Sequence, residues 1–260
     1  MTLRVDALLD VANPGSHRSV TPRRRQMPYK VTKINPSRTA LIIVDMENDF
    51  VAEGAPLRAK MASAVVPLLK RALAHARNTG MRVVFTTHAH RRDGCDMGVF
   101  GRSTPPIAEG KALVDGEKGI EIYDELKPLP NEVVIKKRRY SAFYGTDLDI
   151  VLRSSGMEAV IITGVTTENC CHATARDALF HNYGVIFLSD ATGTFDYPDL
   201  GYGAMSAAEV HRASLVILAM GTAHVMTVDE MIALTTVAKE TGPVPQSRDS
   251  LLTDALSRTA

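Results

Sequence analysis

Apolar residues along the chain form short continuous runs that alternate with longer segments of helical periodicity. The runs are rich in Val, Ile and Leu, which is typical of parallel strands buried on both faces. The predicted strands span residues 39–45, 81–88, 131–137, 158–164, 184–190 and 224–228. Helical spacing predicts helices over residues 64–80, 146–156, 168–183 and 206–221, and a last helix after Thr227. This alternation predicts an α/β fold: one three-layer α/β/α domain around a mainly parallel, Rossmann-like sheet.

Capping residues support several of these helices. Gly80 and Gly156 stand where a helix C-terminus favours a left-handed residue. Thr146 is the predicted N-cap of its helix, and Thr227 with Glu230 has the spacing of a capping box. The helix boundaries are therefore predicted independently of the apolar pattern.

The chain reads as one folded domain with two peripheral segments. We expect a domain over residues 38–240, an N-terminal arm over residues 1–37 and a C-terminal tail over residues 241–260. The arm contains four arginines within residues 17–26, which we interpret as a solvated segment that could also contact a neighbouring subunit. Residues 89–120 have no clear period and predict a long loop, and loops of that length are usually functional or disordered.

Composition excludes several classes of partner. The 260 residues contain 30 Lys and Arg against 29 Asp and Glu, so no net field attracts nucleic acid or a membrane surface. The absence of Trp and the scattered Tyr and Phe give no base-stacking platform. Three cysteines, two of them adjacent, do not make a disulfide framework and fit a reducing cytoplasm. We therefore expect a cytoplasmic protein that acts on a small molecule, without nucleic-acid or membrane partners.

Reactive side chains stand at the ends of three predicted strands. Asp45 ends the first strand, Lys137 ends the third, and Cys170 follows the turn after the fourth. In parallel α/β sheets, chemistry gathers outside the carboxyl ends of the strands. Each residue alone also has a structural explanation, as a turn former, a solvated charge and a packed thiol respectively. Their shared position predicts a site that contains all three.

Two adjacent cysteines raise the question of which one reacts. In a helix that begins near residue 168, Cys171 shares a stripe with Ala175, Ala178 and Leu179, which predicts a buried core position. Cys170 lies about 100° around the helix. It falls in the first turn, where the helix dipole favours a thiolate and is expected to lower the thiol pKa. This argument favours Cys170 as the nucleophile.

Three stretches of the chain resemble the signature blocks of the isochorismatase-like cysteine hydrolases. They are ALIIVDMENDF (40–50), IKKRRYSAFYGTDLDIVLRSSG (135–156) and VIITGVTTENCCHATARDA (160–178). The blocks occur in the order of that family, and the resemblance extends from Thr39 to Leu234. It implies an isochorismatase-like hydrolase domain with a Cys–Asp–Lys triad.

The resemblance assigns the triad residue by residue. The acid of the first block matches Asp45, and the pattern Gly-x-x-Thr-x-x-Cys ends at Cys170. The pattern Lys-x-Arg-Tyr-Ser begins at Lys137, which leaves Lys136 as the weaker candidate. Cys171 stands where the family usually has valine.

The family also implies a mechanism without a cofactor. Asp45 takes the thiol proton of Cys170, the sulfur attacks an amide or ureide carbonyl, and Lys137 stabilises the thiolate. The backbone N–H groups of Thr166 and Cys170 are the expected oxyanion hole. The peptide bond between Val165 and Thr166 is expected to be cis. Ammonia and a thioester are the products of the first step.

The histidines at the end of the second strand and just after it help to narrow the class of substrate. Nicotinamidases of the family carry an acid two residues before the first metal-binding histidine. In this chain the corresponding histidine is His88, and the residue two positions before it is not an acid. We therefore expect no metal, which argues against nicotinamide. The stretch HRRDGCD (90–96) resembles a segment of biuret hydrolases, so we expect a urea-like substrate such as biuret, triuret, an N-carbamoyl compound or ureidoacrylate. The alternatives are an amidase for a small aliphatic amide such as maleamate, a nicotinamidase-like enzyme, and a non-catalytic homologue.

Further residues are candidates for substrate binding, each with a structural alternative. Glu47 also differs from the usual family pattern, because many family members have Gln at that position. Members of the family mostly form dimers or tetramers, which implies that this protein is a homo-oligomer. We expect the N-terminal arm and the helix at 206–221 to form contacts between subunits. The candidate substrate contacts are Glu47, Asn48, Phe50, His90, Arg91, Arg139, Tyr140, Phe143 and Thr167.

Overall fold

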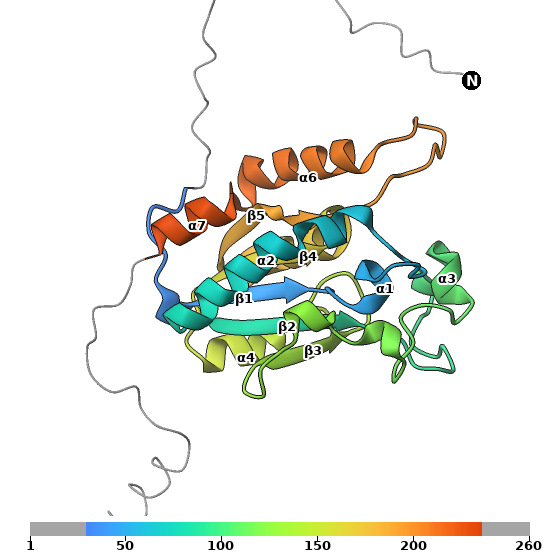
Figure 1. The fold of residues 1–260 in the computed structure, drawn as a ribbon, viewed down its shortest axis with the longest axis horizontal. Helices are drawn as coiled ribbons and strands as arrows, with labels where there is room; N and C mark the ends of the chain where they lie inside the picture. The colour runs from blue at the N-terminus through green and yellow to red at the C-terminus, as the bar shows by residue number, and fades with distance from the viewer. Residues whose placement is uncertain (1–29, 236–260) are drawn as a thin grey trace, which may run out of the picture.

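A six-stranded sheet forms the centre of the molecule (Figure 1). The computed structural model describes residues 30–235. The strand order is β3-β2-β1-β4-β5-β6, and each neighbouring pair is parallel. This is the order of doubly wound dinucleotide-binding folds. The strands are β1 (Thr39–Val44), β2 (Arg82–His88), β3 (Val133–Lys137), β4 (Ala159–Val165), β5 (Gly184–Gly193) and β6 (His224–Met226).

Helices cover both faces of the sheet. One face packs against α2 (Lys60–Thr79) and α7 (Val228–Leu234), and α2 crosses in front of the sheet in Figure 1. The other face packs against α4 (Leu148–Ser154), α5 (His172–Phe180) and α6 (Ala207–Gly221). The predicted three-layer α/β/α fold is therefore confirmed, with all six strands of the sheet parallel.

Strand β1 explains why the apolar runs are continuous. Leu41 and Ile43 pack in the core on the α2 face, whereas Ala40, Ile42 and Val44 pack in the core on the opposite face. Successive side chains of a strand point to opposite faces, so a strand covered on both sides needs apolar residues at every position. All six residues of β1 are buried.

Several predicted boundaries differ from the observed ones. Helix α2 begins at Lys60, four residues before the predicted start, and contains Pro67 without ending there. The predicted helix over residues 168–183 begins instead with a π-helical turn, Thr167–Cys171, and becomes α-helical in α5. The N-cap of α4 is Asp147 rather than Thr146. The capping box predicted before α7 is present.

The predicted loop 89–120 is an ordered connection that contains short helices. Backbone pairing of His90 with Val114 closes the segment on itself, and Glu47 pairs with Ile122 just beyond it. These contacts hold the segment against the end of β1. The short helices of the molecule are η1 (Pro36–Arg38), α1 (Asn48–Val51), η2 (Phe100–Ser103), α3 (Pro105–Ala108), η3 (Lys118–Ile120) and η4 (Asp124–Leu126).

The two ends of the described chain lie together. The backbone N–H of Ile34 donates to Leu234 O at 2.9 Å, and Ile34 also forms a bridge with Thr235. Residues 1–29 of the predicted arm, including the arginine-rich stretch, and the predicted tail lie outside the described residues. The domain boundaries at residues 38 and 240 stay predictions.

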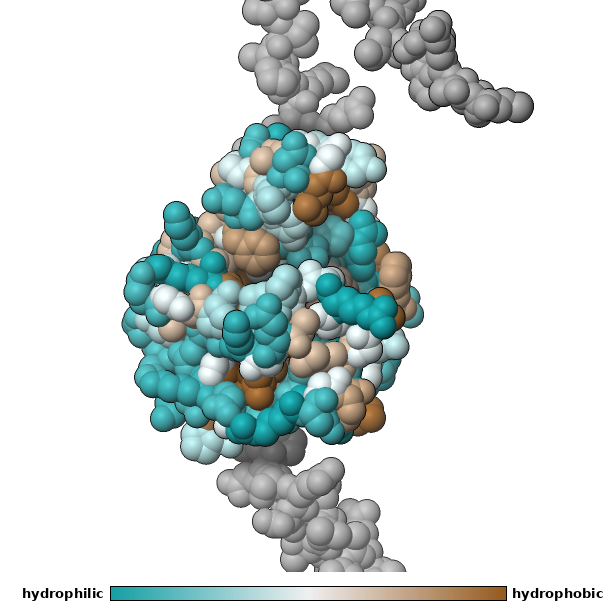
Figure 2. Space-filling model, turned by 90° about the vertical axis from the view of Figure 1, so that its right-hand side faces the viewer, coloured by the Kyte–Doolittle hydropathy of each residue, from teal (hydrophilic) through white to brown (hydrophobic). Residues whose placement is uncertain are grey.

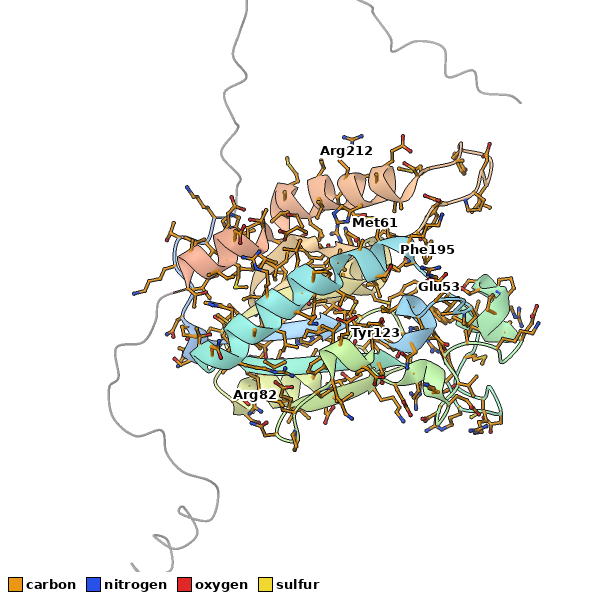
Figure 3. The ribbon with its side chains drawn as sticks, viewed as in Figure 1. Glu53, Met61, Arg82, Tyr123, Phe195 and Arg212 are labelled. Atoms are coloured by element: carbon orange, nitrogen blue, oxygen red, sulfur yellow. The ribbon has the colours of Figure 1, made fainter. Side chains whose placement is uncertain are left out.

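Two features of the described chain concern membrane insertion and the association of subunits. Within residues 30–235, no helix combines the length and the apolar character needed to cross a bilayer. Helix α6 exposes Val216, Ile217 and Met220, and Arg212 projects from the same helix away from the sheet (Figure 3). The predicted association of subunits through α6 stays a prediction.

Candidate active site

The topology brings four reactive side chains to one edge of the sheet. The chain leaves β1 toward β2 on one side, whereas β4 leads to β5 on the other, so β1 and β4 flank the switch point of the sheet. Ligands of such folds bind in the crevice at that point. Asp45 directly follows β1, Cys170 follows β4, and His88 and Lys137 are the last residues of β2 and β3. The end of the molecule to which the strands point is mostly hydrophilic on its surface, with a few hydrophobic residues among the polar ones (Figure 2).

Two backbone features set the approach of β1 to β4. Asp45 has a φ of 47°, in the left-handed region that non-glycine residues rarely adopt, and such residues concentrate at functional sites. Gly164 has a φ of 104°, and a Cβ atom there would lie 2.1 Å from Val44 O. The glycine of the Gly-x-x-Thr-x-x-Cys pattern is therefore needed because no side chain fits between the two strands.

Asp45, Lys137 and Cys170 are in contact and buried. Nζ of Lys137 lies 2.7 Å from Oδ2 of Asp45 and 3.3 Å from Sγ of Cys170. The same ammonium donates to Arg139 O at 3.0 Å, and Thr86 Oγ1 donates to Oδ1 of Asp45 at 2.6 Å. Each oxygen of the carboxylate thus has its own partner, and the ammonium is held between the acid and the thiol.

Burial and charge act on the ionisable groups in opposite directions. Burial alone would lower the pKa of Lys137, but the negative charges of Asp45 and Cys170 outweigh it and raise that pKa. Burial raises the pKa of the Cys170 thiol, and nearby Asp45 raises it further, against the opposing effect of Lys137. The expectation that the helix start lowers the thiol pKa is therefore wrong, because desolvation of the thiolate dominates. The resting thiol keeps its proton and needs a base.

Cys171 faces the core rather than the site. Its Sγ donates to Thr163 O of β4 at 3.6 Å, and the side chain packs in the same apolar cluster as Ala175 and Ala178. Leu179, the fourth member of the predicted stripe, is half-buried. The predicted core position of Cys171 is confirmed.

The turn that carries Cys170 has the expected backbone. The peptide bond between Val165 and Thr166 is cis. Thr166 and Cys170 both line a cavity of about 430 Å³ next to the buried triad. The assignment of their N–H groups to an oxyanion hole stays a prediction.

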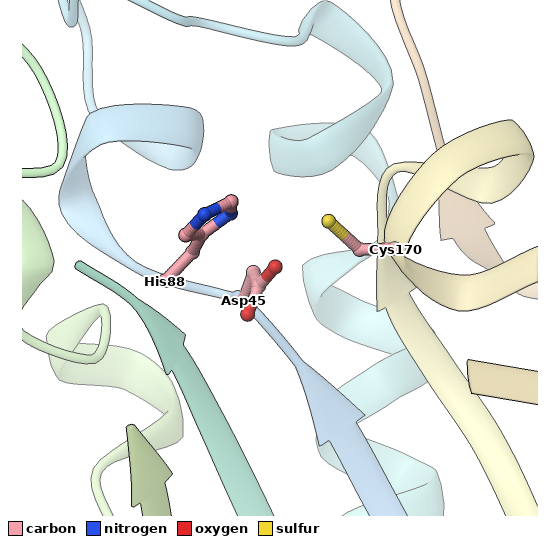
Figure 4. A group of neighbouring side chains, drawn as sticks. All are labelled: Asp45, His88 and Cys170. Carbon is pink, nitrogen blue, oxygen red and sulfur yellow. The ribbon is translucent and has the colours of Figure 1, made fainter. Parts of the chain in front are cut away.

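His88 belongs to this site although it was not among the candidate contacts. Its side chain lines the cavity, and Nε2 is buried without a hydrogen-bond partner in the described chain. Burial, and then the charges of Lys137 and His90, hold its pKa well below the usual value, so the ring is neutral at pH 7. Figure 4 shows Asp45 between His88 and Cys170, with the sulfur directed toward the space between them. The rule used for the triad could have found His88, because it ends β2 in register with Lys137.

Asp45, His88 and Cys170 are also possible metal ligands. One donor atom from each lies within 4.8 Å of the others. However, the ammonium of Lys137 already contacts both Asp45 and Cys170. A metal ion bound by the same atoms would lie beside this buried positive charge, so the donor set does not fit a metal well.

Some predicted substrate contacts lie at or behind the cavity. Phe50 and Tyr140 line it. Glu47 is buried behind it, where Oε2 accepts a hydrogen bond from the backbone N–H of His88 at 3.2 Å. Burial raises the pKa of Glu47 well above its usual value, with a further contribution from the charge of Asp45. Glu47 is therefore a buried acid beside the triad, and burial favours its protonated form.

His90 and Arg91 of the HRRDGCD stretch lie around Asp96, beside the cavity. The buried ring of His90 lies 5.1 Å from that of His88 and 5.8 Å from that of Phe100. His90 lies 3.3 Å from Asp96 through Nδ1, and the side chain of Arg91 is 61% exposed and faces the same acid. Arg139 donates to Asp96 O at 3.0 Å and lies over the ring of Phe100. None of the three basic residues lines the cavity of the described chain. Asp96 contacts all three of them.

The remaining predicted contacts also have other partners. Asn48 donates to a backbone carbonyl of η3 at 2.9 Å. Phe143 stacks on His181 with a centroid distance of 5.0 Å, and Thr167 Oγ1 lies 2.9 Å from Nδ1 of His211. None of these three residues lines the cavity.

One wall of the cavity has polar residues that the sequence did not indicate. Asn169 and Tyr197 line it, and Asn169 Nδ2 donates both to Tyr197 Oη and to Oε1 of Glu168 at 3.0 Å. Tyr197 donates to the same carboxylate oxygen at 3.0 Å. The position of Asn169 next to Cys170 is the signal that could have identified it. Tyr197 comes from a distant segment and offered no such signal.

The doubly wound α/β fold thus carries a buried cluster of Asp45, Lys137 and Cys170 at the switch point of its sheet. Residues 39–230 match the Isochorismatase domain. The chain therefore belongs to the isochorismatase-like hydrolase family.

Similar proteins and solved structures agree with this assignment. The chain is 32% identical over 197 residues to the ureidoacrylate amidohydrolase RutB of Pantoea ananatis (strain LMG 20103), across 69% of this chain and 77% of that protein. It is similar to a cysteine hydrolase structure from Pseudomonas syringae pv. phaseolicola 1448A, with a TM-score of 0.77 and 37% identity over 80% of this chain and 96% of that one. The N-carbamoylsarcosine amidase of Thermoplasma acidophilum matches with a TM-score of 0.59 and 28% identity over 74% and 97% of the two chains.

Proposed function

We propose that the protein is a cysteine-dependent amidohydrolase that cleaves a C–N bond of a small ureide and releases ammonia. The observation that carries the proposal is the position of one buried ammonium, Lys137 Nζ, 2.7 Å from Asp45 and 3.3 Å from the sulfur of Cys170. Two similar proteins are named for ureido or carbamoyl substrates, RutB and N-carbamoylsarcosine amidase, which supports the ureide class.

The first half of the reaction forms a covalent intermediate. Asp45 accepts the thiol proton of Cys170 as the sulfur attacks the ureide carbonyl, because the resting thiol has a raised pKa. Lys137 stabilises the negative charge on sulfur, and the N–H groups of Thr166 and Cys170 would bind the oxyanion. The C–N bond breaks, and ammonia leaves with the proton from Asp45. The product is a thiocarbamate on Cys170, which corresponds to a thioester when the substrate is an amide.

The second half regenerates the enzyme. Water attacks the thiocarbamate carbonyl and gives a proton to Asp45, which returns it to the departing sulfur of Cys170. The released carbamic acid loses carbon dioxide in solution. Lys137 keeps the leaving thiolate stable throughout, since its ammonium stays paired with the carboxylate.

The identity of the ureide substrate is a separate question from the reaction. Biuret, triuret, N-carbamoyl compounds and ureidoacrylate all contain the reacting group. His90 and Arg91 both contact Asp96, so their positions do not support a role in binding biuret. An amidase for a small aliphatic amide such as maleamate is the second candidate, because an apolar cavity also accepts a carbon chain attached to the carbonyl.

Ammonia release across a substrate panel tests the proposal. The panel holds ureides (biuret, triuret, an N-carbamoyl amino acid, ureidoacrylate and N-alkyl ureas) and two amides, maleamate and nicotinamide, with the Cys170→Ala variant as the blank. We expect the highest kcat/KM for a ureide. A higher kcat/KM for maleamate or nicotinamide than for every ureide would reject the ureide class but not the cysteine mechanism.

A further inference from the structure

We infer that the substrate is an N-substituted urea whose substituent is uncharged and apolar, an alkyl or aryl group rather than a chain that carries a carboxylate. This inference rests on the proposed ureide hydrolysis and specifies the part of the substrate beyond the reacting carbonyl. It separates the chain from similar proteins named for acids, such as the ureidoacrylate amidohydrolase.

The cavity next to Cys170 has mostly apolar walls. Its volume of about 430 Å³ falls within the range of about 300–1,000 Å³ typical of small-molecule sites. Carbon-rich side chains reach it from the α1 region, from the segment 100–113 and from the segment after β5, where Figure 3 shows Phe195. The apolar lining residues are Phe50, Leu57, Phe100, Pro105, Ile107, Leu113, Phe195, Pro198 and Leu200.

Several polar side chains also line the cavity, among them Ser103, Thr104, Asn169 and Tyr197, and two of the polar groups suit a ureido group. Asn169 uses its Nδ2 group on Glu168 and Tyr197, so its carbonyl oxygen is the group left to accept a hydrogen bond. His88 lines the same cavity with a buried Nε2 that has no partner in the described chain. Acceptors of this kind fit the N–H groups of a urea and place its carbonyl at the sulfur.

The cavity offers no positive charge to an anionic substituent. No lysine or arginine of the described chain lines it, and His88 is neutral because its pKa is well below the usual value. Lys137 is fully buried and already paired with Asp45. Arg139 does not line the cavity: it lies over the ring of Phe100, donates to Asp96 O, and lines an adjoining hollow that shares Phe100 and Tyr140 with the cavity. A carboxylate bound here would lose its hydration without gaining a partner, which is strongly unfavourable.

A comparison of four ureides tests the inference in the wild-type enzyme. Ammonia release is measured for N-butylurea, phenylurea, N-carbamoyl-β-alanine and biuret. We expect kcat/KM for one of the two apolar ureas to exceed that for N-carbamoyl-β-alanine by about 100-fold or more, because the carboxylate is left unpaired in the cavity. A kcat/KM for N-carbamoyl-β-alanine or biuret equal to or above that of both apolar ureas would overturn the inference.

A charge introduced at the cavity mouth gives a second, independent test. Leu200 lines the cavity and is 76% exposed, so Leu200→Arg adds a cation there without disturbing the core. Tyr202 is 99% exposed in the same segment and does not line the cavity, which makes Tyr202→Arg the matched control. We expect Leu200→Arg to raise the ratio of N-carbamoyl-β-alanine to N-butylurea turnover by roughly tenfold, the usual scale of one bond to a charged group. An equal change in both variants would contradict the role of the cavity wall.

Binding separates this inference from the proposed reaction. The Cys170→Ala variant cannot form the covalent intermediate, so calorimetry with N-butylurea and N-carbamoyl-β-alanine reports on the cavity alone. Tighter binding of N-butylurea, together with no ammonia from any ureide in the wild type, would reject the proposed reaction and leave only the preference of the cavity for an uncharged substituent supported. Tighter binding of N-carbamoyl-β-alanine would overturn the cavity inference, whatever the turnover of the wild type.

Discussion

The ammonium of Lys137 lies 2.7 Å from the carboxylate of Asp45, and both side chains are fully buried. Lys137 ends β3 and Asp45 directly follows β1, and the two strands are separated in the sheet by β2. A buried pair of this kind compensates both charges, and removal of one partner leaves the other uncompensated. Removal of either partner of this pair is therefore expected to lower the stability of the protein as well as its activity.

Replacement of Lys137 tests this dual role. Lys137→Met leaves Asp45 as an unpaired buried charge, so we expect a loss of about 3–5 kcal/mol in the free energy of unfolding and no measurable ammonia release. Urea denaturation and the ammonia assay measure the two effects. Lys136→Met is the matched control, because Lys136 is exposed and pairs with Asp115 at the surface. Comparable losses in both variants would refute the assignment of Lys137.

Glu47 predicts a specific dependence of stability on pH. Burial raises its native pKa well above the value of about 4.3 in unfolded chains. The native state then holds a proton that the unfolded state lacks, so the contribution of Glu47 is full below pH 4.3 and is lost as pH rises toward the native pKa. Glu47→Gln keeps an oxygen acceptor for the N–H of His88 and removes the titration. We expect the stability of the variant relative to wild type to rise by up to about 1.4 kcal/mol per pH unit as pH rises above about 4.3 toward the native pKa.

Urea denaturation at one-unit intervals of pH checks this slope. Glu53→Gln is the control, because the Glu53 side chain is largely exposed near α1 (Figure 3). Parallel pH profiles for wild type and Glu47→Gln would show that Glu47 does not hold its proton in the native state.

Chelation tests the expected independence from metal. The ammonium of Lys137 contacts two of the three residues that could bind an ion, Asp45 and Cys170. We therefore expect prolonged dialysis against EDTA to leave kcat/KM unchanged. Lost activity that zinc or iron restores would require a metal in the mechanism.

The sequence predicted the fold and the position of the triad because both depend on short-range patterns. Continuous apolar runs identify buried parallel strands, and residues at their carboxyl ends must converge on one edge of the sheet. Asp45, Lys137 and Cys170 are accordingly found in contact. His88 satisfies the same rule and could have been added.

The cavity lining could not be predicted in the same way. Phe100, Ile107 and Phe195 reach the site from connections whose course depends on tertiary packing, not on periodicity. The motif resemblance placed Arg91 near a substrate, but the position of Asp96 decides where that side chain points. The raised pKa of Cys170 was missed for a related reason, because helix position is visible in a sequence and the extent of burial is not.

The direct test of the account is ammonia release by single variants of the two adjacent cysteines. Cys170→Ser keeps the geometry of the site but replaces the nucleophile, whereas Cys171→Val fills the core position in which Cys171 packs against Thr163. We expect Cys170→Ser to lose about 10⁴-fold or more in kcat. Cys171→Val should stay within about threefold of wild type, since swaps of similar volume in a core usually cost less than about 1.5 kcal/mol. Activity retained in Cys170→Ser, or lost in a folded Cys171→Val protein, would contradict Cys170 as the nucleophile.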